Sequence, residues 1–257
     1  MDFKNYLIDL DGTLYLGTEI IEGAVEFIQY LKDNCKNYVF LTNNSSKNSD
    51  SYAKKLTNLG IPCSPNEVFT SGEATALTLS LIKKNANVYV VGTSDLHSEI
   101  SAAGLNIING TNTAPDFVAL GFDTTLTYEK IRTACDFIRN GVPFYATQPD
   151  INCLIEGNKL LPNCGAITDM FIASTGISPT IIGKPNLFIM DACFKKYGFK
   201  KGETLMIGDR LYTDIASGLK YGIKTALVLS GETTIEEYNA SNYKADYVLE
   251  SVKSIII

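Results

Sequence analysis

The stretch Tyr6-Leu7-Ile8-Asp9-Leu10-Asp11-Gly12-Thr13 combines a short apolar run with two carboxylates. A run that is apolar on both faces is typical of a strand buried between two layers of helices. Asp9 closes this run, where a charge is costly to bury unless it is paired or bound to a metal. Asp11 follows two residues later, so in an extended chain both carboxylates face the same side. The stretch therefore predicts a buried strand with a polar site at its carboxyl end.

Further apolar runs of the same kind end in polar or glycine-containing turns; they are Tyr38–Leu41, Val88–Val91, Phe117–Leu120, Leu205–Ile207 and Ala226–Leu229. Helical spacing of apolar residues separates the runs, from Ile21 to Leu31, from Tyr52 to Leu59, from the predicted N-cap Thr127 to Ile138, and from Ile189 to Tyr197 behind Pro185 in a first helical turn. This alternation of strands and helices predicts an α/β fold with a largely parallel sheet.

The middle third of the chain has its own strand–helix alternation and contains none of the chemically active motifs found on either side. We therefore expect an inserted domain at residues 85–179. Residues 1–84 plus 180–257 would form the other domain. A chain of 257 residues is long enough to bury a substantial core in either arrangement.

Composition excludes several classes of partner. The net charge is −6 and the isoelectric point is about 4.9, so we expect neither a nucleic-acid polymer nor an anionic membrane as partner. No apolar stretch approaches the roughly 20 residues needed to span a bilayer, and no signal peptide fits the polar start. The six cysteines include no C-x-x-C pair and His97 is the single histidine, which disfavours a zinc site. We expect reduced thiols in a cytoplasmic protein.

Polar clusters directly follow four apolar segments, which is where open α/β sheets place their sites. The clusters are Asp9–Thr13, Thr42–Ser45, Gly183–Pro185, and Gly208–Arg210 followed by Thr213-Asp214. Carboxylates that converge at sheet ends repel one another, and a hard divalent cation with oxygen ligands resolves the repulsion, which favours Mg²⁺ over zinc. Asp-Gly and Gly-Asp pairs also form ordinary turns. Two such pairs, each ending an apolar strand, favour the metal site.

The other clusters supply groups that can bind phosphate. Thr42 and the residues after it offer a hydroxyl, amides and backbone N–H groups, although the same residue types also cap helices for local reasons. Lys184 offers the local positive charge that an acidic protein needs, although a single lysine is by default solvated. A Walker loop is excluded because Pro185 stands where that motif needs Ser or Thr. Asp214 could orient Lys184 or a metal-bound water, or could simply begin a helix.

Together these residues indicate phosphoryl transfer. A carboxylate nucleophile needs its charge balanced by a metal and a lysine while donors hold the attacked phosphoryl group. A second carboxyl, a role suited to Asp11, could protonate the leaving alcohol and then deprotonate water. Phosphoryl transfer asks the protein mainly for positioning and charge neutralisation.

In order and spacing, the motifs resemble those of the haloacid dehalogenase superfamily of phosphohydrolases. The resemblance narrows to the class IIA, NagD-like and p-nitrophenylphosphatase-like family through Thr42–Ser45, Ala146–Asp150, Gly165–Ile167, and Ser174–Gly176 leading to Ile182–Pro185. It implies a Rossmann-like, doubly wound parallel sheet core with a large α/β cap domain, of the kind typical of class IIA, inserted between the second and third motifs. A homodimer through the cap would also fit the resemblance.

The resemblance implies a role for each acidic motif residue. Asp9 is expected to be the nucleophile and a magnesium ligand. Asp11 is expected to be the general acid/base and to bind the metal through its backbone carbonyl. Asp209 is expected to be the other carboxylate ligand, with Asp214 supporting the site.

The resemblance also implies a set of substrate contacts. The residues expected to bind or neutralise the phosphate are Thr42, Asn43, Asn44 and Lys184, with Thr42 and Lys184 also counted as catalytic. Gln148 and Asp150 are expected to meet the substrate from the cap. Gln148 stands where the family commonly has Asn, and Pro162–Gly165 replaces a more glycine-rich stretch, so substrate identity stays open.

The predicted function is a phosphoric monoester hydrolase, a Mg²⁺-dependent phosphatase acting through a phosphoaspartyl intermediate on Asp9. The predicted substrates are small phosphomonoesters of the nucleoside monophosphate, sugar phosphate or p-nitrophenyl phosphate type. Two alternatives use the same residue types: a non-catalytic protein that binds phosphate or phosphometabolites, and a phosphorylation-switched signalling receiver. Receivers are about half this length and lack the insertion.

Overall fold

The computed structural model describes residues 2–110, 113–155 and 159–256. Two compact units make up the chain. Unit 1 comprises Met1–Thr42, Ser49–Phe69 and Cys193–Ile257, and unit 2 comprises Asn43–Asn48 and Thr70–Ala192. Each unit has its own sheet.

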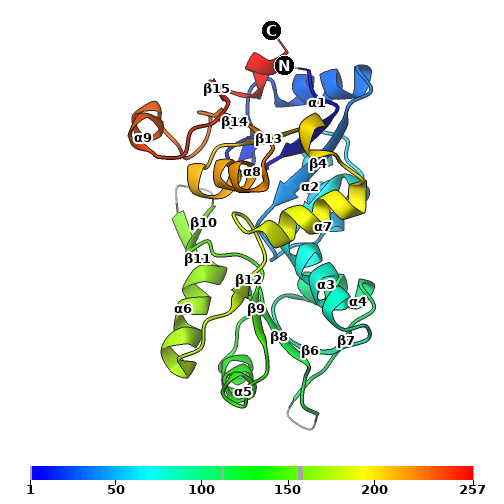
Figure 1. Cartoon of the computed structure of the whole chain (residues 1–257), viewed down its shortest axis with the longest axis vertical. Helices are drawn as coiled ribbons and strands as arrows, with labels where there is room; N and C mark the ends of the chain where they lie inside the picture. Colours follow the sequence, from blue (N-terminus) through cyan, green and yellow to red (C-terminus); the bar gives the residue numbers. More distant parts are fainter. Residues whose placement is uncertain (1, 111–112, 156–158, 257) are drawn as a thin grey trace. The chain divides into compact units, whose positions relative to one another are not determined.

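The sheet of unit 1 has the strand order β15-β14-β13-β1-β4-β5. Its strands are β1 (Asn5–Ile8), β4 (Asn37–Thr42), β5 (Val68–Thr70), β13 (Thr204–Gly208), β14 (Lys224–Val228) and β15 (Tyr247–Leu249). β1 pairs in parallel with both β4 and β13, so that Ile8 lies opposite Phe40 and Ile207. In Figure 1, β15, β14, β13 and β4 follow one another in this order across unit 1. The chain extends the sheet from β1 to one side first and later to the other. This reversal places the topological switch point, where such sheets bind ligands, between β1 and β13.

Helices and short turns complete unit 1. They are α1 (Ala24–Asp33), α2 (Ser49–Asn58), α8 (Ala216–Tyr221), α9 (Ile235–Ala240), the π-helical turn Leu211–Ile215 and the 3-10 turns Pro65–Glu67, Lys201–Glu203 and Val252–Ile255. A small antiparallel hairpin, β2 (Tyr15–Leu16) and β3 (Glu19–Ile20), follows the first motif. α1 packs its apolar stripe, which includes Phe27 and Leu31, into one core cluster with Tyr6 and Ile8 of β1. The unit boundary passes through α7 (Leu187–Tyr197) after Ala192.

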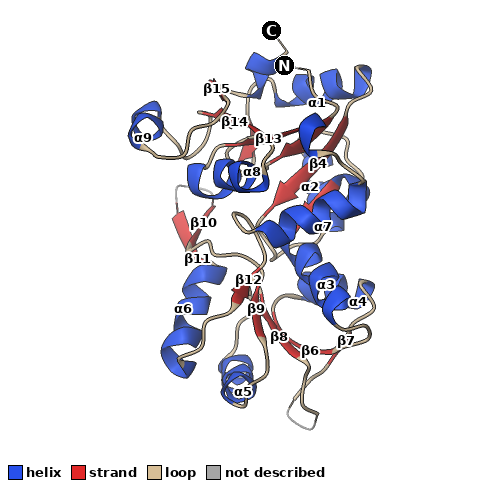
Figure 2. Cartoon of the chain, in the orientation of Figure 1, coloured by secondary structure: helices blue, strands red, loops and turns tan. Residues whose placement is uncertain are grey.

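The sheet of unit 2 has the order β12-β9-β8-β6-β7. Its strands are β6 (Asn87–Val91), β7 (Asn106–Ile107), β8 (Phe117–Leu120), β9 (Phe144–Ala146) and β12 (Thr180–Ile181), and its helices are α3 (Ser71–Ile82), α4 (Ser94–Ala102), α5 (Tyr128–Arg139) and α6 (Cys164–Thr175). Alternate side chains of the strands point to opposite faces of the sheet: Val91 and Val118 pack with α5 and α6, whereas Val90 and Ala119 pack with α3 and α4. Figure 2 shows these two pairs of helices on different sides of the strands. A hairpin of β10 (Asn152–Ile155) and β11 (Lys159–Pro162) precedes α6.

The α/β fold class with parallel sheets is confirmed, and every predicted apolar run overlaps a strand. Thr127 is the N-cap of α5, as predicted, because its side chain accepts a hydrogen bond from the Lys130 N–H. The placement of Pro185 in the first turn of a helix is wrong. The Asn186 N–H bonds to Gly183 O at 2.9 Å, so a turn intervenes and α7 begins at Leu187. The functional division into residues 1–84 plus 180–257 and residues 85–179 stays a prediction.

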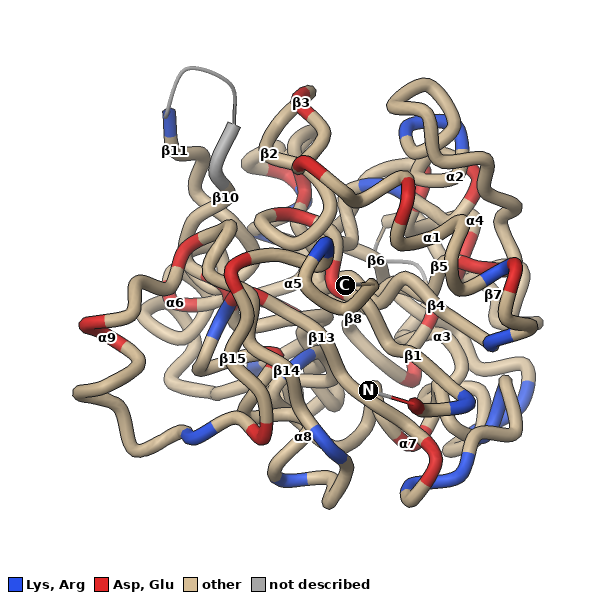
Figure 3. Tube along the Cα trace, turned by 90° about the horizontal axis from the view of Figure 1, so that it is seen from above, with Lys and Arg blue, Asp and Glu red and all other residues tan. Residues whose placement is uncertain are grey.

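Charged residues of both signs are spread along the chain. Figure 3 shows basic and acidic positions interspersed along the described trace, without a basic stripe. Among the described helices, none is both long enough and apolar enough to cross a bilayer.

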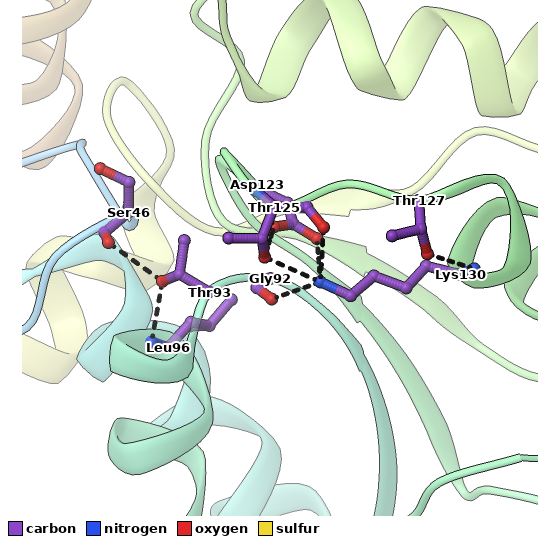
Figure 4. A network of polar contacts seen from close by, with 8 residues as sticks. All are labelled: Ser46, Gly92, Thr93, Leu96, Asp123, Thr125, Thr127 and Lys130. Atoms are coloured by element: carbon purple, nitrogen blue, oxygen red, sulfur yellow. Dashed lines mark hydrogen bonds and ion pairs between the residues drawn. The ribbon is translucent and has the colours of Figure 1, made fainter.

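The segment Asn43–Asn48 belongs to unit 2 because it is bonded to the carboxyl ends of that unit's strands. The Ser45 hydroxyl lies 2.8 Å from the Thr147 hydroxyl after β9 and accepts from the Phe122 N–H after β8 at 2.9 Å. Thr93, which follows β6, donates its hydroxyl to Ser46 O at 3.0 Å (Figure 4). The edge at which an open sheet could take a ligand is therefore covered here by the protein's own chain.

An ion pair with a fully buried carboxylate fixes the loops at the same edge (Figure 4). The Asp123 side chain is completely buried and meets Lys130 Nζ at 2.7 Å. Lys130 also donates to Gly92 O at 3.0 Å and to the Thr125 hydroxyl at 3.0 Å, while Asp123 Oδ1 accepts from the Thr125 N–H at 2.8 Å. Removing one member of such a pair leaves the other charge buried without compensation.

We expect Lys130→Met to lower the free energy of unfolding by on the order of 3 kcal/mol, because Asp123 would keep a buried charge without its partner. Adding Asp123→Asn should recover part of that loss. The matched control is Lys83→Met, which breaks the more exposed pair with Asp116 and should cost under about 1 kcal/mol. Urea unfolding midpoints measure all three variants, and an equal loss for Lys130→Met and Lys83→Met would contradict the prediction.

Candidate active site

Three buried carboxylates meet at the switch point of unit 1. One oxygen from each of Asp9, Asp209 and Asp214 lies within 4.8 Å of the others. Asp9 is 8% exposed, Asp209 1% and Asp214 is fully buried. Asp9 follows β1, Asp209 follows β13, and Asp214 comes from the π-helical turn after β13. The sheet register causes this meeting, because the Asp9 N–H bonds to Ile207 O at 2.9 Å and so aligns the ends of the two strands.

Glycines make room for these carboxylates. A Cβ on Gly12 would lie 2.2 Å from Asp209 Oδ2, and Gly12 also has a φ of +86° that disfavours other residues. A Cβ on Gly208 would lie 2.3 Å from the Asp214 side chain. The two glycines in the Asp-Gly and Gly-Asp pairs are therefore needed for close packing around the acidic groups.

Asp209 has the environment of a metal ligand. Its Oδ2 accepts a hydrogen bond from the Glu232 N–H at 2.7 Å, whereas its buried Oδ1 has no hydrogen-bond partner among the described residues. Burial, reinforced by the charge of Asp214, raises the pKa of Asp209 to about 7. A divalent cation would remove this penalty by supplying positive charge to several oxygens at once. The donor set fits Mg²⁺ better than zinc because all its atoms are hard oxygens.

Asp11 follows Asp9 in sequence, and its carboxylate is hydrogen-bonded to Tyr15. Its half-buried carboxylate accepts a hydrogen bond from the Tyr15 hydroxyl at 3.4 Å, and the Gly12 N–H donates to Tyr15 O at 2.8 Å. Burial and the Asp11 charge hold the pKa of Tyr15 well above its usual range, so the phenol stays a donor. Lys55 Nζ lies 3.7 Å from the centre of the Tyr15 ring. The tight turn thus fixes Asp11 against a neutral phenol.

In unit 2, Lys184 is 1% exposed and its backbone is held by Asn43. The Lys184 N–H donates to Asn43 Oδ1 at 2.8 Å, and Asn43 Nδ2 donates to Lys184 O at 3.0 Å. Asn43 Nδ2 also lies 3.2 Å from Asp150 Oδ1. These three predicted site residues are therefore connected directly.

The side chains of two other residues predicted to contact the substrate, Asn44 and Gln148, are hydrogen-bonded to other groups of the protein. Asn44 Oδ1 accepts from the Ser46 N–H at 2.9 Å and from the Ser46 hydroxyl at 2.7 Å. Gln148 is fully buried; its Nε2 donates to Asn163 Oδ1 at 2.6 Å and its Oε1 accepts from the Asp150 N–H. Both side chains thus support local turns.

The predicted site residues fall into two groups that belong to different units. Unit 1 contains Thr42, at the carboxyl end of β4, together with Asp9, Asp11, Asp209 and Asp214. Unit 2 contains Asn43, Asn44, Gln148, Asp150 and Lys184. The roles of these residues stay predictions.

The sequence analysis missed the segment after β14. The Ser230 hydroxyl donates to Gly12 O at 2.9 Å, a Cβ on Gly231 would lie 2.1 Å from Asp209 Oδ2, and Glu232 binds Asp209 through its N–H. Glu232 also pairs with Arg210 at 2.8 Å. A Ser-Gly pair directly after an apolar strand was the available signal. Tyr15 was missed as well, because a sequence does not show which way a buried phenol points.

Known proteins resemble this chain over nearly its whole length. The model of the haloacid dehalogenase-like hydrolases matches residues 6–106, and a second model, HAD-hydrolase-like, matches residues 181–255. The 5'-nucleotidase YutF of Bacillus subtilis is 42% identical over 250 residues, covering 97% of this chain and 96% of the relative. An acid sugar phosphatase of Staphylococcus aureus is 40% identical, covering 99% and 97%. The crystal structure of a 4-nitrophenylphosphatase from Thermotoga maritima has a TM-score of 0.92 at 40% identity, covering 98% and 96%.

The fold, the acidic cluster at the switch point and these relatives together define a hydrolase with a doubly wound α/β fold. The chain belongs to the haloacid dehalogenase-like hydrolases, in their class IIA, NagD-like and p-nitrophenylphosphatase-like family. The family predicted from the motifs is therefore confirmed.

We expect the stability of the metal-free protein to fall as the pH rises from about 4 to 8. The folded-state pKa of Asp209 lies above its unfolded value, so folding favours the protonated acid and loses that contribution as the pH passes about 7. Saturating Mg²⁺ at pH 8 should raise the melting temperature by about 5–10 °C. Asp209→Asn should raise the metal-free melting temperature at pH 8 and abolish most of the Mg²⁺ effect.

The control for this prediction is Asp33→Asn, which changes an exposed carboxylate on α1. It should respond to pH and Mg²⁺ like the unchanged protein. Thermal melts with EDTA and with MgCl₂ at pH 5.5 and 8 measure both effects, and a full Mg²⁺ response in Asp209→Asn would contradict the assignment.

Proposed function

We propose that the protein is a Mg²⁺-dependent phosphatase that transfers the phosphoryl group of a small phosphomonoester to Asp9 and then to water. The relatives described above are named a 5'-nucleotidase, an acid sugar phosphatase and a 4-nitrophenylphosphatase, so the chain is a phosphoric monoester hydrolase, as predicted. The meeting of Asp9 with Asp209 and Asp214 at the β1/β13 switch point is the observation that carries the mechanism. A buried carboxylate that shares a cation and faces the ligand-binding edge of a sheet suits a nucleophile.

The first step forms a phosphoaspartate. A carboxylate oxygen of Asp9 attacks phosphorus, the bond from phosphorus to the alcohol oxygen breaks, and Asp11 gives its proton to the leaving alkoxide. Asp9, Asp209 and the backbone carbonyl of Asp11 would hold Mg²⁺, which would supply the positive charge that offsets these carboxylates and the phosphoryl oxygens. Asp214 supports Asp209 in this arrangement.

The second step releases inorganic phosphate. Asp11, now ionised, takes a proton from water as the water oxygen attacks phosphorus, and the bond from phosphorus to Asp9 breaks. The Thr42 hydroxyl and the backbone N–H groups of Asn43 and Asn44 hold the phosphoryl oxygens, and Lys184 neutralises their charge. Positioning and charge neutralisation are the main demands of this reaction.

The substrates we propose are small phosphomonoesters. The relatives include a 5'-nucleotidase, an acid sugar phosphatase and a 4-nitrophenylphosphatase, so nucleoside monophosphates, sugar phosphates and p-nitrophenyl phosphate form the test panel. We propose residues 1–84 plus 180–257 as the catalytic core and residues 85–179 as the cap that selects substrates. A homodimer through this cap is part of the proposal. A cytoplasmic location is part of the same proposal.

We expect Asp9→Asn to lower kcat by at least about 1,000-fold, because the amide cannot form the phosphoenzyme. Phosphate release from p-nitrophenyl phosphate with MgCl₂ measures the loss, and Asp33→Asn is the control with unchanged turnover. Undiminished turnover in Asp9→Asn would exclude the mechanism. Tight phosphate binding by the unchanged protein without hydrolysis of any panel member would instead indicate a non-catalytic binding protein.

We expect Asp11→Asn to affect substrates according to their leaving groups. An alkoxide needs a proton to leave, whereas p-nitrophenolate does not, so kcat/KM should fall about 100-fold or more for a sugar phosphate and much less for p-nitrophenyl phosphate. Tyr15→Phe should also lower kcat/KM more for the sugar phosphate than for p-nitrophenyl phosphate. Both losses should be smaller than in Asp11→Asn, because the phenol only orients Asp11. Tyr128→Phe, at a position that is 80% exposed, is the control. Equal losses for both substrates would contradict the role of Asp11 as acid.

A further inference from the structure

One side chain holds both backbone polar groups of Lys184. The Asn43 carboxamide accepts from the Lys184 N–H at 2.8 Å and donates to Lys184 O at 3.0 Å. Asn43 is 6% exposed and Lys184 1%, so both bonds are shielded from water. Gly183 permits this approach, because a Cβ there would lie 2.7 Å from Asn43 Oδ1 and 2.5 Å from Thr147 O. The backbone of Lys184 is therefore held in place by a side chain that is distant in sequence.

Asp150 determines which way the Asn43 carboxamide points. A carboxamide has two donor hydrogens on nitrogen and an acceptor oxygen, and the two ends are nearly equal in shape. Asn43 Nδ2 lies 3.2 Å from Asp150 Oδ1 and 3.5 Å from Oδ2. The reversed carboxamide would bring its oxygen against this carboxylate and against Lys184 O. The acidic group therefore favours the orientation in which both backbone groups of Lys184 are bonded.

Asp150 is itself held by the turn in which it lies. Its N–H donates to Gln148 Oε1, and its carbonyl accepts from the Gly165 N–H at 2.8 Å, in the first turn of α6. The Gln148 amide is anchored in turn on Asn163, the N-cap of α6. A Cβ on Gly165 would lie 2.2 Å from Pro149 O, so this close contact needs glycine. Gln148 thus supports Asp150 from a fully buried position.

We infer that Asn43 and Asp150 are positioning residues for Lys184: the Asn43 carboxamide aids phosphate binding by holding the lysine and not by touching the phosphate. The inference deepens the proposed function and rests on its assignment of Lys184 as the group that neutralises the phosphoryl charge. The donor hydrogens of Asn43 Nδ2 point to Lys184 O and Asp150, and its oxygen takes the Lys184 N–H. These contacts use both donors of the carboxamide.

A double-mutant cycle between Asn43 and Lys184 tests the inference. Asn43→Ala should raise the inhibition constant of inorganic phosphate and lower kcat/KM by about 10- to 100-fold, as expected for a displaced catalytic group. In the Lys184→Met background the same change should have an effect of less than about 3-fold, because no ammonium group is left to position. Losses that multiply in the double variant would show that Asn43 acts on the phosphate independently, and would overturn the inference.

Variants of Asp150 give a second, independent readout. Asp150→Asn keeps an oxygen that can accept from Asn43 Nδ2, so it should retain phosphate affinity within about 3-fold. Asp150→Ala removes the acceptor and should lose about 10-fold or more. Equal losses in the two variants would show that Asp150 acts through its charge, and would overturn its role in orienting Asn43. Asn140→Ala, at an exposed residue after α5, is the matched control.

The failure of this inference can be told apart from failure of the proposed function. Phosphate inhibition of p-nitrophenyl phosphate hydrolysis is measured with Mg²⁺ on the full chain, alongside thermal melts that report folding of each variant. An inactive wild-type protein would overturn the proposed function. An active wild type with independent effects of Asn43 and Lys184 would overturn the positioning role alone.

Discussion

Repulsion among three buried carboxylates is the constraint on which the rest of unit 1 depends. Asp9, Asp209 and Asp214 lie at the edge where a doubly wound sheet binds ligands, and water reaches little of them. Burial first, and the charge of Asp214 second, raise the pKa of Asp209. A fold can hold such groups together only if backbone dipoles, close-packed glycines and a cation offset the cost. The Glu232 N–H and the glycines at 12, 208 and 231 supply the first two, and a divalent cation would complete the set.

The parts that could be predicted from the sequence are those with a local physical cause. Strands such as Tyr6–Ile8 and Phe117–Leu120 were predictable because burial on both faces needs continuous apolar runs. Thr127 was predictable as an N-cap because the capping bond is made within one turn. The meeting of Asp9 and Asp209 followed from the rule that parallel strands end at the same edge.

The parts that could not be predicted depend on register and side-chain direction. Glu232 reaches Asp209 only because β14 lies next to β13 with Leu227 opposite Gly208, and no local pattern encodes that neighbour. Asn43, Asn44 and Gln148 show the same difficulty at the level of single side chains. A carboxamide donates and accepts equally well, so its presence in a motif does not tell whether it bonds a ligand or the protein. In this chain all three bond the protein.

This use of carboxamides changes how sequence variation in the proposed cap, residues 85–179, should be understood. Gln148 and Asp150 were expected to contact the substrate. Within unit 2, Gln148 binds Asp150, and Asp150 is hydrogen-bonded to Asn43, which holds the backbone of Lys184. If Lys184 neutralises the phosphoryl group common to all substrates, a change at Gln148 or Asp150 acts on that common step as well as on selection. Substrate preference and phosphate affinity would then be linked through hydrogen bonds and not through shape alone. A displaced lysine weakens the binding of every phosphomonoester alike. Selection between substrates by their leaving alcohols therefore has to depend on side chains other than Asn43, Gln148, Asp150 and Lys184.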